Sequence, residues 1–508
     1  MTHSKLFSTI KYLFLGYLTL VFIGMVFVDE NLDYYSVIQQ FKLSNWLILI
    51  VVLLGALGYY FLYRKLGTKQ LKHFKRFLII YALVFLVIQM IISYNLYFYT
   101  DWDVKNLMYL SDRINAGTNI NNLHYLQTYP NNAFLAWNFA VLKRMFTYLG
   151  LDSYRGLIYL GNLITNLSIV LAALVIKKLS KNDFWTISVL VLGSIIIGLS
   201  PWITIPYSDA YGTLFPILVI YLEISLEDQK QRIPLVTLVT AIGYLIKPTV
   251  VIVLIASIII RGILLFKSKP KFKKVISSFF IVVAIVFSLW GFKNLTYLSI
   301  GFKADKESEF SLTHYLMMGL NQDSNGGYSG KDFRFSAYYL NSQERKQAEI
   351  KETVNRLKNY GWDYPEFLFK KSMSVYNDGT FFWSGEGTFD NGSYTYFYQE
   401  ISGINNTLSE VLHEFYWYNE NNYAVFVNIA QAFWLFTLLG IFGNWLRKPN
   451  EKETLIMLSL LGLSLFLLLF EQRSRYLYLY LPLFIVLSIN GWRKLFSSGG
   501  KLDNADVL

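Results

Sequence analysis

Residues 64–103 read RKLGTKQLKHFKRFLIIYALVFLVIQMIISYNLYFYTDWD, and this stretch predicts the fold of the whole chain. Its first part, residues 64–76, has six Lys or Arg side chains and no acidic one, which is typical of a cytoplasmic connection. The apolar run that follows, residues 77–98, is long enough for one helix across a bilayer. We therefore expect this helix to cross outward and to deliver Asp101 and Asp103 to the outer face.

The composition of the chain repeats this pattern. The 508 residues are 54% hydrophobic and 18% aromatic, arranged in many apolar runs that suit a multi-pass membrane protein. The net charge of +12 comes from Lys and Arg in short connections between these runs, so we expect no nucleic-acid partner. The absence of cysteine excludes disulfides, thiol catalysis and Cys-ligated metals.

The alternation of basic connections with polar segments predicts about twelve spans with both termini inside. The fold class is an all-α polytopic membrane protein of about 12 transmembrane helices, with an extracytoplasmic insertion of mixed structure. The predicted spans are residues 6–28, 45–63, 77–98, 156–176, 184–200, 210–226, 233–246, 250–266, 275–292, 424–440, 455–470 and 476–492.

Five regions follow from this topology. They are residues 1–76, two N-terminal spans with a basic inner loop; 77–292, a membrane core with the first outer loop 99–154; 293–423, an extracytoplasmic domain; 424–492, the C-terminal spans; and 493–508, a cytoplasmic tail. In the outer loop, residues 133–149 carry Lys143 and Arg144 near their middle and predict an interfacial amphipathic helix. In the insertion, residues 341–360 predict one amphipathic helix capped by Asn341.

Two aspartates are the first candidates for chemistry. Asp101 and Asp103 follow an outer helix end, where one carboxylate can act as general base toward an acceptor hydroxyl. The second carboxylate can orient that hydroxyl or hold a divalent metal. The alternative is that both acids only mark the helix end in water. Asp209 is a further candidate, and its alternative is a cap for a helix that begins at Ala210.

Three cationic residues lie on the predicted outer side of the membrane, although Lys and Arg are usually enriched on the cytoplasmic side. Arg473 and Arg475 flank Ser474 at the outer end of the eleventh span, and Lys247 precedes Pro248 at another outer helix end. A guanidinium binds two phosphate oxygens at once, so these positions favour an anionic partner. The alternative is that they are snorkelling anchors at the interface.

The insertion contributes a histidine and many aromatic residues. His314 precedes a glycine-rich stretch, residues 326–330, and could bond a phosphate or sugar oxygen, although a lone histidine is more often structural. The aromatic residues suit stacking on sugar faces, and most of them would equally form the core of a small domain.

These features together resemble the GT-C glycosyltransferases, membrane enzymes that use polyprenyl- or dolichyl-phosphate sugars and include protein O-mannosyltransferases and the bacterial aminoarabinose transferase. The resemblance rests on Asp101 and Asp103, on the Tyr129-Pro130 start of an interfacial helix, on Ile246-Lys247-Pro248-Thr249 and on the late arginine, Arg473 or Arg475. The chain departs from the pattern in two ways. Two extra spans precede the usual first helix, and the acids form Asp-Trp-Asp rather than Asp-Glu.

The resemblance implies transfer of a sugar from an undecaprenyl-phosphate donor, with inversion, to an outer acceptor such as teichoic acid, wall polysaccharide or protein. Asp101 or Asp103 would be the base. Arg473, Arg475, Lys247 and His314 would bind the donor phosphate, and Asp209, Tyr129 and Asn131 would lie on the acceptor side. No organic cofactor is expected, while Asp101 and Asp103 could hold a divalent metal. We expect the cytoplasmic membrane of a Gram-positive bacterium.

Two other function classes stay open. A transporter or flippase of lipid-linked glycans predicts ionisable residues in the middle of spans and often shows an internal repeat, and no convincing repeat is found here. A non-catalytic partner in cell-envelope synthesis predicts that Asp101 and Asp103 can be replaced without loss of function.

Overall fold

The computed structural model describes residues 3–28, 42–96, 102–268, 272–387, 406–418 and 420–498. Helices joined by turns and short connections account for these residues, and no strand occurs among them, so the all-α prediction is confirmed there. The mixed structure predicted for the insertion is wrong for its described residues. Its turn-forming Asn, Ser and Gly residues separate short helices rather than strands.

Six helices in the described part of the chain are long and apolar enough to cross a membrane. They are α1 (His3–Phe27), α2 (Asn45–Leu66), α3 (Phe74–Asn95), α7 (Ser153–Ser180), α20 (Tyr423–Phe442) and α21 (Glu451–Leu469). Other predicted spans coincide with α8 (Asp183–Gly193), α10 (Leu214–Ser225), α11 (Gln229–Ile246), α12 (Val251–Ser268), α13 (Phe272–Ser299) and α22 (Leu481–Ser498). The count of about twelve spans stays a prediction.

Contacts between helix ends agree with the predicted alternation. The basic connection, residues 64–76, lies against the start of α8, where the backbone N–H of Leu71 donates to Asp183 Oδ2 at 2.8 Å. At another predicted inner end, Lys494 Nζ lies 2.9 Å from Glu453 Oε2 and ties α22 to the start of α21. We call this side of the bundle the basic-loop end. The opposite side, which carries the candidate residues, is called the site end.

Polar side chains inside the apolar bundle bond to one another. Gln89 on α3 donates to the carbonyl oxygen of Gly198 at 3.2 Å and accepts from Asn166 on α7 at 3.2 Å. One turn nearer the site end, Asn162 Nδ2 donates to Ser93 Oγ at 2.8 Å. Interhelical hydrogen bonds of this kind stabilise packing where water is absent.

The predicted first outer loop folds into α4 (Asp103–Asn115), α5 (His124–Thr128) and α6 (Ala133–Tyr148). The predicted helix at 133–149 is therefore present. Lys143 in its middle is buried, because its ammonium group pairs with Asp112 and donates to Ser111 Oγ at 3.2 Å. The charge that separates this helix from an ordinary span thus fixes α6 on α4.

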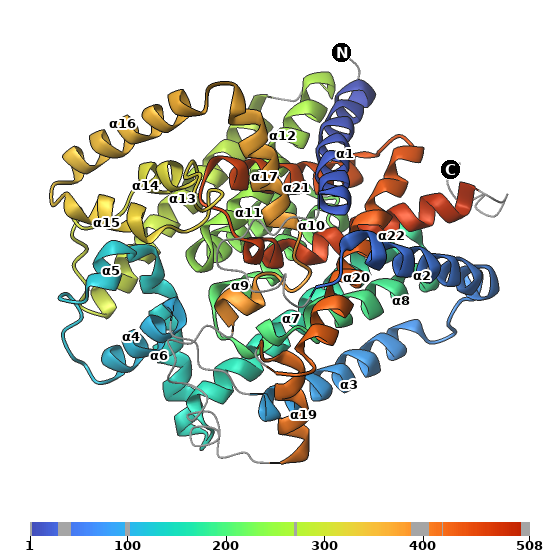
Figure 1. Cartoon of the computed structure of the whole chain (residues 1–508), viewed down its shortest axis with the longest axis horizontal. Coiled ribbons are helices and arrows are strands. Elements are labelled where there is room, and N and C mark those ends of the chain that lie inside the picture. The colour runs from blue at the N-terminus through green and yellow to red at the C-terminus, as the bar shows by residue number, and fades with distance from the viewer. Residues whose placement is uncertain are drawn as a thin grey trace.

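The insertion forms a layer of shorter helices at the site end. They are α14 (Leu312–Met318), α15 (Gly330–Tyr338), α16 (Ser342–Tyr360), α17 (Tyr364–Tyr376) and α19 (Thr407–Tyr416). Figure 1 shows α14, α15 and α16 together on the side of the molecule away from the N- and C-termini.

The predicted helix at 341–360 is confirmed, but the face that it buries is not the apolar one. Asn341 caps it by accepting from the backbone N–H groups of Gln343 and Glu344 at 3.0 and 3.1 Å. The apolar side chains at helical spacing, Ile350 and Val354 among them, are exposed. The packed face is polar, because Glu349 finds hydroxyl partners on α14 and α15.

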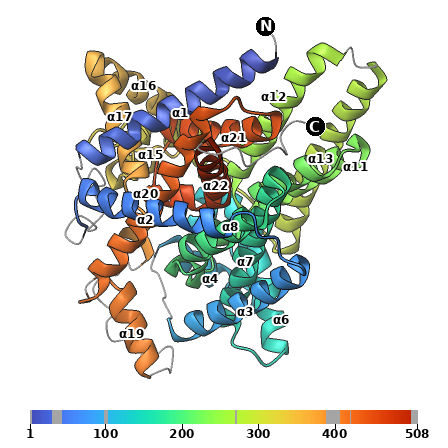
Figure 2. The same ribbon diagram turned by 90° about the vertical axis from the view of Figure 1, so that its right-hand side faces the viewer.

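Glycines let α20 and α22 approach each other closely (Figure 2). A Cβ atom added to Gly491 would lie 1.9 Å from the carbonyl oxygen of Gly440, and one added to Gly443 would lie 2.1 Å from that of Gly491. Small residues at such crossings permit backbone contact between membrane helices.

We expect Gly491→Ala to force these helices apart and to lower the free energy of unfolding by about 1–3 kcal/mol. Thermal unfolding of the purified protein in detergent measures the loss. The control is Gly55→Ala on α2, where an added Cβ meets no heavy atom within 4 Å. Equal transition temperatures for Gly491→Ala and the wild type would contradict the packing.

Candidate functional site

A group of buried charges lies at the site end, assembled from four separate stretches of the chain. Asp209 stands on the short helix α9 (Ser208–Gly212), Lys247 follows α11, and Glu386 lies in the π-helical turn Trp383–Gly387. Arg473 and Arg475 follow α21. We call these five residues the charge cluster.

Each carboxylate of the cluster contacts two cations. One carboxylate oxygen of Asp209 lies 2.7 Å from Arg475 Nη1, and the other lies 2.9 Å from Lys247 Nζ. Glu386 contacts Arg475 Nε and lies 3.4 Å from Arg473 Nε. Asp209, Arg473 and Arg475 are at most 4% exposed. Three cations and two carboxylates therefore lie together in a place shielded from water, with the carboxyl groups of Asp103 and Glu471 nearby.

Aromatic rings surround the Arg475 guanidinium. Its central carbon lies 4.3 Å from the ring centre of Trp102, 5.1 Å from Tyr207 and 5.5 Å from Tyr476. Trp102 is fixed in turn, because its indole N–H donates to the carbonyl oxygen of Glu386 at 2.7 Å. Cation–π contacts and exclusion of water both strengthen the electrostatic interactions within the cluster.

Asp103 is joined to the cluster through Tyr207. It is the first residue of α4 and is partly buried, and its Oδ2 accepts from the Tyr207 hydroxyl at 2.9 Å. Burial, and then the Asp103 carboxylate, raise the pKa of Tyr207 and Tyr125 well above the usual range. Both phenols therefore stay protonated at neutral pH and can donate to a carboxylate.

Glu471 is a second carboxyl group beside this site. It precedes the arginines, and the Tyr476 hydroxyl donates to its Oε1 at 3.4 Å. Burial raises the pKa of Glu471, and the guanidinium groups of Arg473 and Arg475 oppose this shift. Glu471 therefore adds a buried carboxyl group whose protonated form is favoured by burial and opposed by the two arginines.

The structure brings together five of the predicted site residues: Asp103, Asp209, Lys247, Arg473 and Arg475. Tyr129 lies close by, in ring contact with Tyr125 at 5.4 Å, and the Asp103 carboxylate is among the causes that raise the pKa of Tyr129. Asn131 is exposed and donates to the neighbouring Asn132 at 3.3 Å. Asp101 lies outside the described residues.

His314 lies in a different network. Its Nδ1 is 2.7 Å from Ser336 Oγ and 3.9 Å from Glu349 Oε1, and its ring packs on Phe310 at 4.3 Å. Burial lowers the pKa of His314 to about 4, so the ring is neutral at pH 7. These contacts occupy Nδ1 of the ring, and the predicted role of His314 in binding a phosphate or sugar oxygen stays a prediction.

No pattern in the sequence marked Glu386 or Tyr207. Glu386 closes a short aromatic and glycine-rich turn deep in the insertion, and Tyr207 stands in the loop just before Asp209. The sequence offers only closeness to candidate residues. Tyr207 is two residues from the candidate Asp209, and Trp102 stands between the candidates Asp101 and Asp103.

The described residues hold no group of three His, Cys, Asp or Glu side chains arranged to bind a metal ion. Asp103 faces Tyr207, and its predicted partner Asp101 lies outside those residues. The predicted metal pair therefore stays a prediction.

A buried lysine holds the arginine-bearing segment in place. Lys371 Nζ on α17 donates to the carbonyl oxygens of Gly319, Leu468 and Phe470, at 2.5, 3.0 and 2.8 Å. Gly319 has to be glycine, because a Cβ there would lie 2.6 Å from the backbone of Phe470. The segment that leads to Arg473 is thus tied to α17 and to the loop after α14.

The loop after α14 adds backbone bonds to the same segment. The N–H of Gln472 donates to the carbonyl oxygen of Gly326 in this loop at 2.9 Å, and the N–H of Glu471 donates to the carbonyl oxygen of Tyr315, within α14, at 3.0 Å. Gly326 adopts a φ of +73°, which favours glycine. These bonds set the direction in which Arg473 and Arg475 enter the cluster.

Asp209→Asn should lower the free energy of unfolding by about 3–5 kcal/mol, because it leaves Arg475 and Lys247 buried without their shared charge. The double variant Asp209→Asn/Lys247→Met should lose less than the sum of the single changes. Thermal unfolding in detergent measures both. The control Glu366→Gln, in a mostly exposed pair with Lys370, should change stability by less than about 1 kcal/mol. Strict additivity in the double variant would contradict the coupling.

His314 should make the fold sensitive to acid. Because burial lowers its pKa from 6.5 to about 4, the unfolded chain binds a proton below pH 6.5 that the folded chain refuses. Stability from this group is complete above pH 6.5 and falls by about 3 kcal/mol as the pH drops to 4. Glu349, Asp332 and Arg345 also face the ring and titrate or carry charge.

His314→Asn should therefore show a shallower loss of stability between pH 6.5 and 4 in thermal unfolding than the wild type. The comparison removes only the imidazole and leaves Glu349, Asp332 and Arg345 in both proteins. An unchanged slope would show that His314 is not buried in its neutral form.

Comparison with known proteins concerns almost the whole chain. A family model described as conserved hypothetical integral membrane protein matches residues 3–495, which include the apolar helices and every residue of the charge cluster. No curated protein and no solved structure matches the chain. The apolar helices and the family match agree that this is an integral membrane protein. The chain belongs to this family of conserved hypothetical integral membrane proteins.

Proposed function

We propose that the protein is a membrane glycosyltransferase that moves a sugar from a polyprenyl-phosphate donor to an acceptor outside the cytoplasmic membrane. The observation that carries the proposal is the meeting of Asp103 and the charge cluster in one buried site, through the Tyr207 bridge. A carboxylate next to a group of buried cations suits a displacement in which one partner loses a proton and the other leaves as an anion.

In the proposed reaction the acceptor hydroxyl attacks the anomeric carbon from the face opposite the phosphate. The new carbon–oxygen bond forms while the bond between that carbon and the phosphate oxygen breaks, with inversion. Asp103, or Asp101 beside it, takes the hydroxyl proton. The phosphate leaves with the lipid carrier, and the cluster stabilises its developing charge.

Arg475 can serve an anionic ligand while it keeps its protein partners. A guanidinium has five N–H donors. The ion pairs of Arg475 involve Nη1 with Asp209 and Nε with Glu386. Its contacts within the described residues therefore leave Nη2 for a phosphate oxygen. Lys247 and Arg473 add positive charge nearby, which supports recognition of a phosphate.

An apolar cavity lies between helices of the bundle, toward the basic-loop end. It has a volume of 650 Å³ and runs between α2, α8 and α20, lined by side chains such as Val51, Phe184 and Phe433. The hydroxyls of Tyr59 and Ser188, which also line it, bond to each other at 2.7 Å. Lys69 and Leu71 of the basic connection also line this cavity, so an apolar chain bound there would lie at the basic-loop end, on the side of the bundle opposite the charge cluster.

The test is transfer of labelled sugar from polyprenyl-phosphate donors to wall polymer in proteoliposomes. Asp103→Asn should reduce the rate about 100-fold to 10,000-fold if Asp103 is the base, and Asp101→Asn should do so if Asp101 is. Glu366→Gln, which changes an exposed acid on α17 outside the site, should retain the wild-type rate. Thermal unfolding checks that each variant is folded.

Full activity in both Asp103→Asn and Asp101→Asn would contradict the assignment of the base. Absence of transfer by the wild type with every donor tested would contradict the enzyme and favour transport or a non-catalytic role. Movement of the lipid-linked glycan across the bilayer without transfer would identify the transporter.

A further inference from the structure

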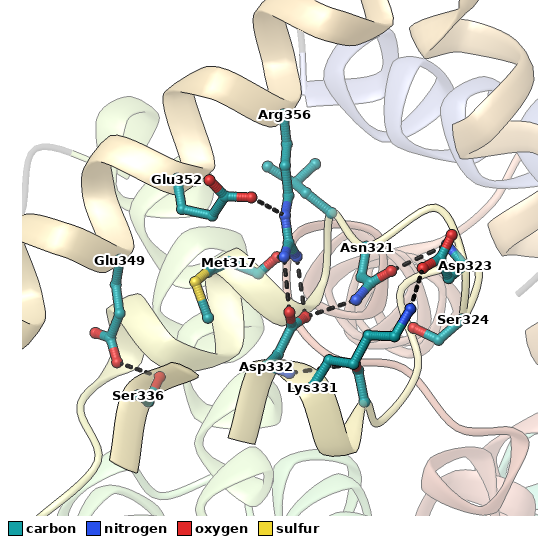
Figure 3. Close-up of polar contacts among 12 residues, drawn as sticks. Met317, Asn321, Asp323, Ser324, Lys331, Asp332, Ser336, Glu349, Glu352 and Arg356 are labelled. Carbon is teal, nitrogen blue, oxygen red and sulfur yellow. Dashed lines mark hydrogen bonds and ion pairs between the residues drawn. The ribbon is translucent and has the colours of Figure 1, made fainter. Parts of the chain in front are cut away.

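A pocket of 420 Å³ opens in the layer of shorter helices, apart from the charge cluster. It lies between α15, α16 and the loop that follows α14. Its lining combines amide, charged and aromatic side chains: Gln322, Asp323, Lys331, Phe335, Asn359 and Tyr360. Figure 3 shows the polar contacts on one side of this pocket.

The floor of the pocket is a rigid, internally paired group. Arg356 donates from Nη1 and Nη2 to the two oxygens of Asp332, at 2.9 and 2.7 Å, as the dashed lines in Figure 3 show. Asn321 donates to Asp332 at 2.9 Å, and Arg356 also reaches the carbonyl oxygen of Met317 at 2.8 Å. These charges satisfy each other, so the floor gives the pocket its shape and little net charge.

The rim of the pocket offers both donors and acceptors. Lys331 and Asp323 form a pair at 3.2 Å, with side chains 77% and 75% exposed. Such a pair contributes little to stability and can exchange its partner for a ligand. Gln322 and Asn359 are exposed, and the described residues give their side chains no hydrogen-bond partner.

Aromatic rings form part of the wall. The Tyr360 hydroxyl is already used, because it donates to the carbonyl oxygen of Leu320 at 3.0 Å. The Tyr360 ring is itself buried and packs on Phe367 at 4.5 Å, so the ring surface that faces the pocket comes mainly from the partly buried Phe335. Sugars combine hydroxyl groups with an apolar C–H face, and a wall of rings below a rim of amides matches both.

We propose that this pocket binds a sugar unit of a neutral glycan, the acceptor of the transfer reaction. The assignment rests on the proposed function for its role as acceptor site. The charge balance favours a neutral ligand, because Asp323, Asp332 and Glu352 stand against only Lys331 and Arg356. A polymer of phosphodiesters would meet an excess of carboxylates here.

The pocket and the charge cluster share one loop. Leu320 to Asp323 line the pocket, and Gly326, whose N–H donates to the carbonyl oxygen of Asn321 at 2.8 Å, accepts the backbone bond from Gln472. Lys371 holds Gly319 at the start of the same loop. A glycan seated in the pocket would therefore lie against the loop that positions Arg473.

The test is ligand binding by the full chain in lipid nanodiscs, measured by saturation-transfer NMR. The probes are neutral oligosaccharides of glucose, galactose, rhamnose and N-acetylglucosamine, and a glycerol-phosphate oligomer. Gln322→Ala/Asn359→Ala should weaken binding of the neutral ligand about tenfold, since it removes two rim groups that each contribute roughly 0.5–1.5 kcal/mol. Asn355→Ala, exposed on α16 one turn before Asn359 and outside the pocket, should bind like the wild type.

Three results would each contradict the proposal that this pocket binds a neutral glycan. They are binding of the glycerol-phosphate oligomer alone, binding of no probe, and equal affinity of the double variant and the wild type for the neutral ligand. The transfer assay separates the two proposals. Glycan binding without any transfer would support the glycan-binding pocket and contradict the proposed glycosyltransferase activity. Transfer with an unchanged acceptor KM in the double variant would support the glycosyltransferase activity and contradict the assignment of the pocket as the acceptor site.

Discussion

A guanidinium buried at the end of a bundle of apolar helices needs carboxylates in contact, and Arg475 imposes this requirement on the whole structure. Its two partners come from distant parts of the chain, and Asp209 is 266 residues away in sequence. Left without them, the charge would cost several kcal/mol. The helix that carries Asp209, the turn that carries Glu386 and the end of α21 therefore have to meet at one side of the bundle.

The surrounding architecture serves this meeting point. Lys371 and the loop after α14 hold the segment before Arg473, while Trp102 and Tyr207 enclose Arg475 and bring in α4. These contacts join the insertion to the bundle through polar groups. A site built in this way is pre-organised, because the cations are already oriented and desolvated before a ligand arrives.

The sequence predicted the parts of this arrangement that follow from hydropathy and charge. Apolar runs located the helices, and the basic connection 64–76 placed Asp103, Asp209, Lys247 and Arg475 on one side, where the structure indeed brings them together.

What the sequence left open depends on long-range contacts. Glu386 joins the cluster from a short turn in the insertion. The residues around it in the sequence do not distinguish it from the other acidic residues of the insertion. The apolar spacing of α16 indicated a helix but not its packed face, since Glu349 is buried and Ile350 is exposed. His314 looked like a ligand, but a tertiary network of Ser336 and Glu349 surrounds it.

Recognition of a lipid-borne phosphate by the charge cluster underlies the proposed transfer reaction. Native mass spectrometry of the full chain with polyprenyl phosphate and with the uncharged polyprenol tests it most directly, in the wild type and in Arg475→Lys. This change keeps a positive charge for Asp209 and removes Nη2, the guanidinium donor that is left for a phosphate oxygen. We expect saturable binding of the phosphate in preference to the alcohol, and loss of that preference in Arg475→Lys. Equal binding of phosphate and alcohol by the wild type, or an unchanged preference in the variant, would contradict it.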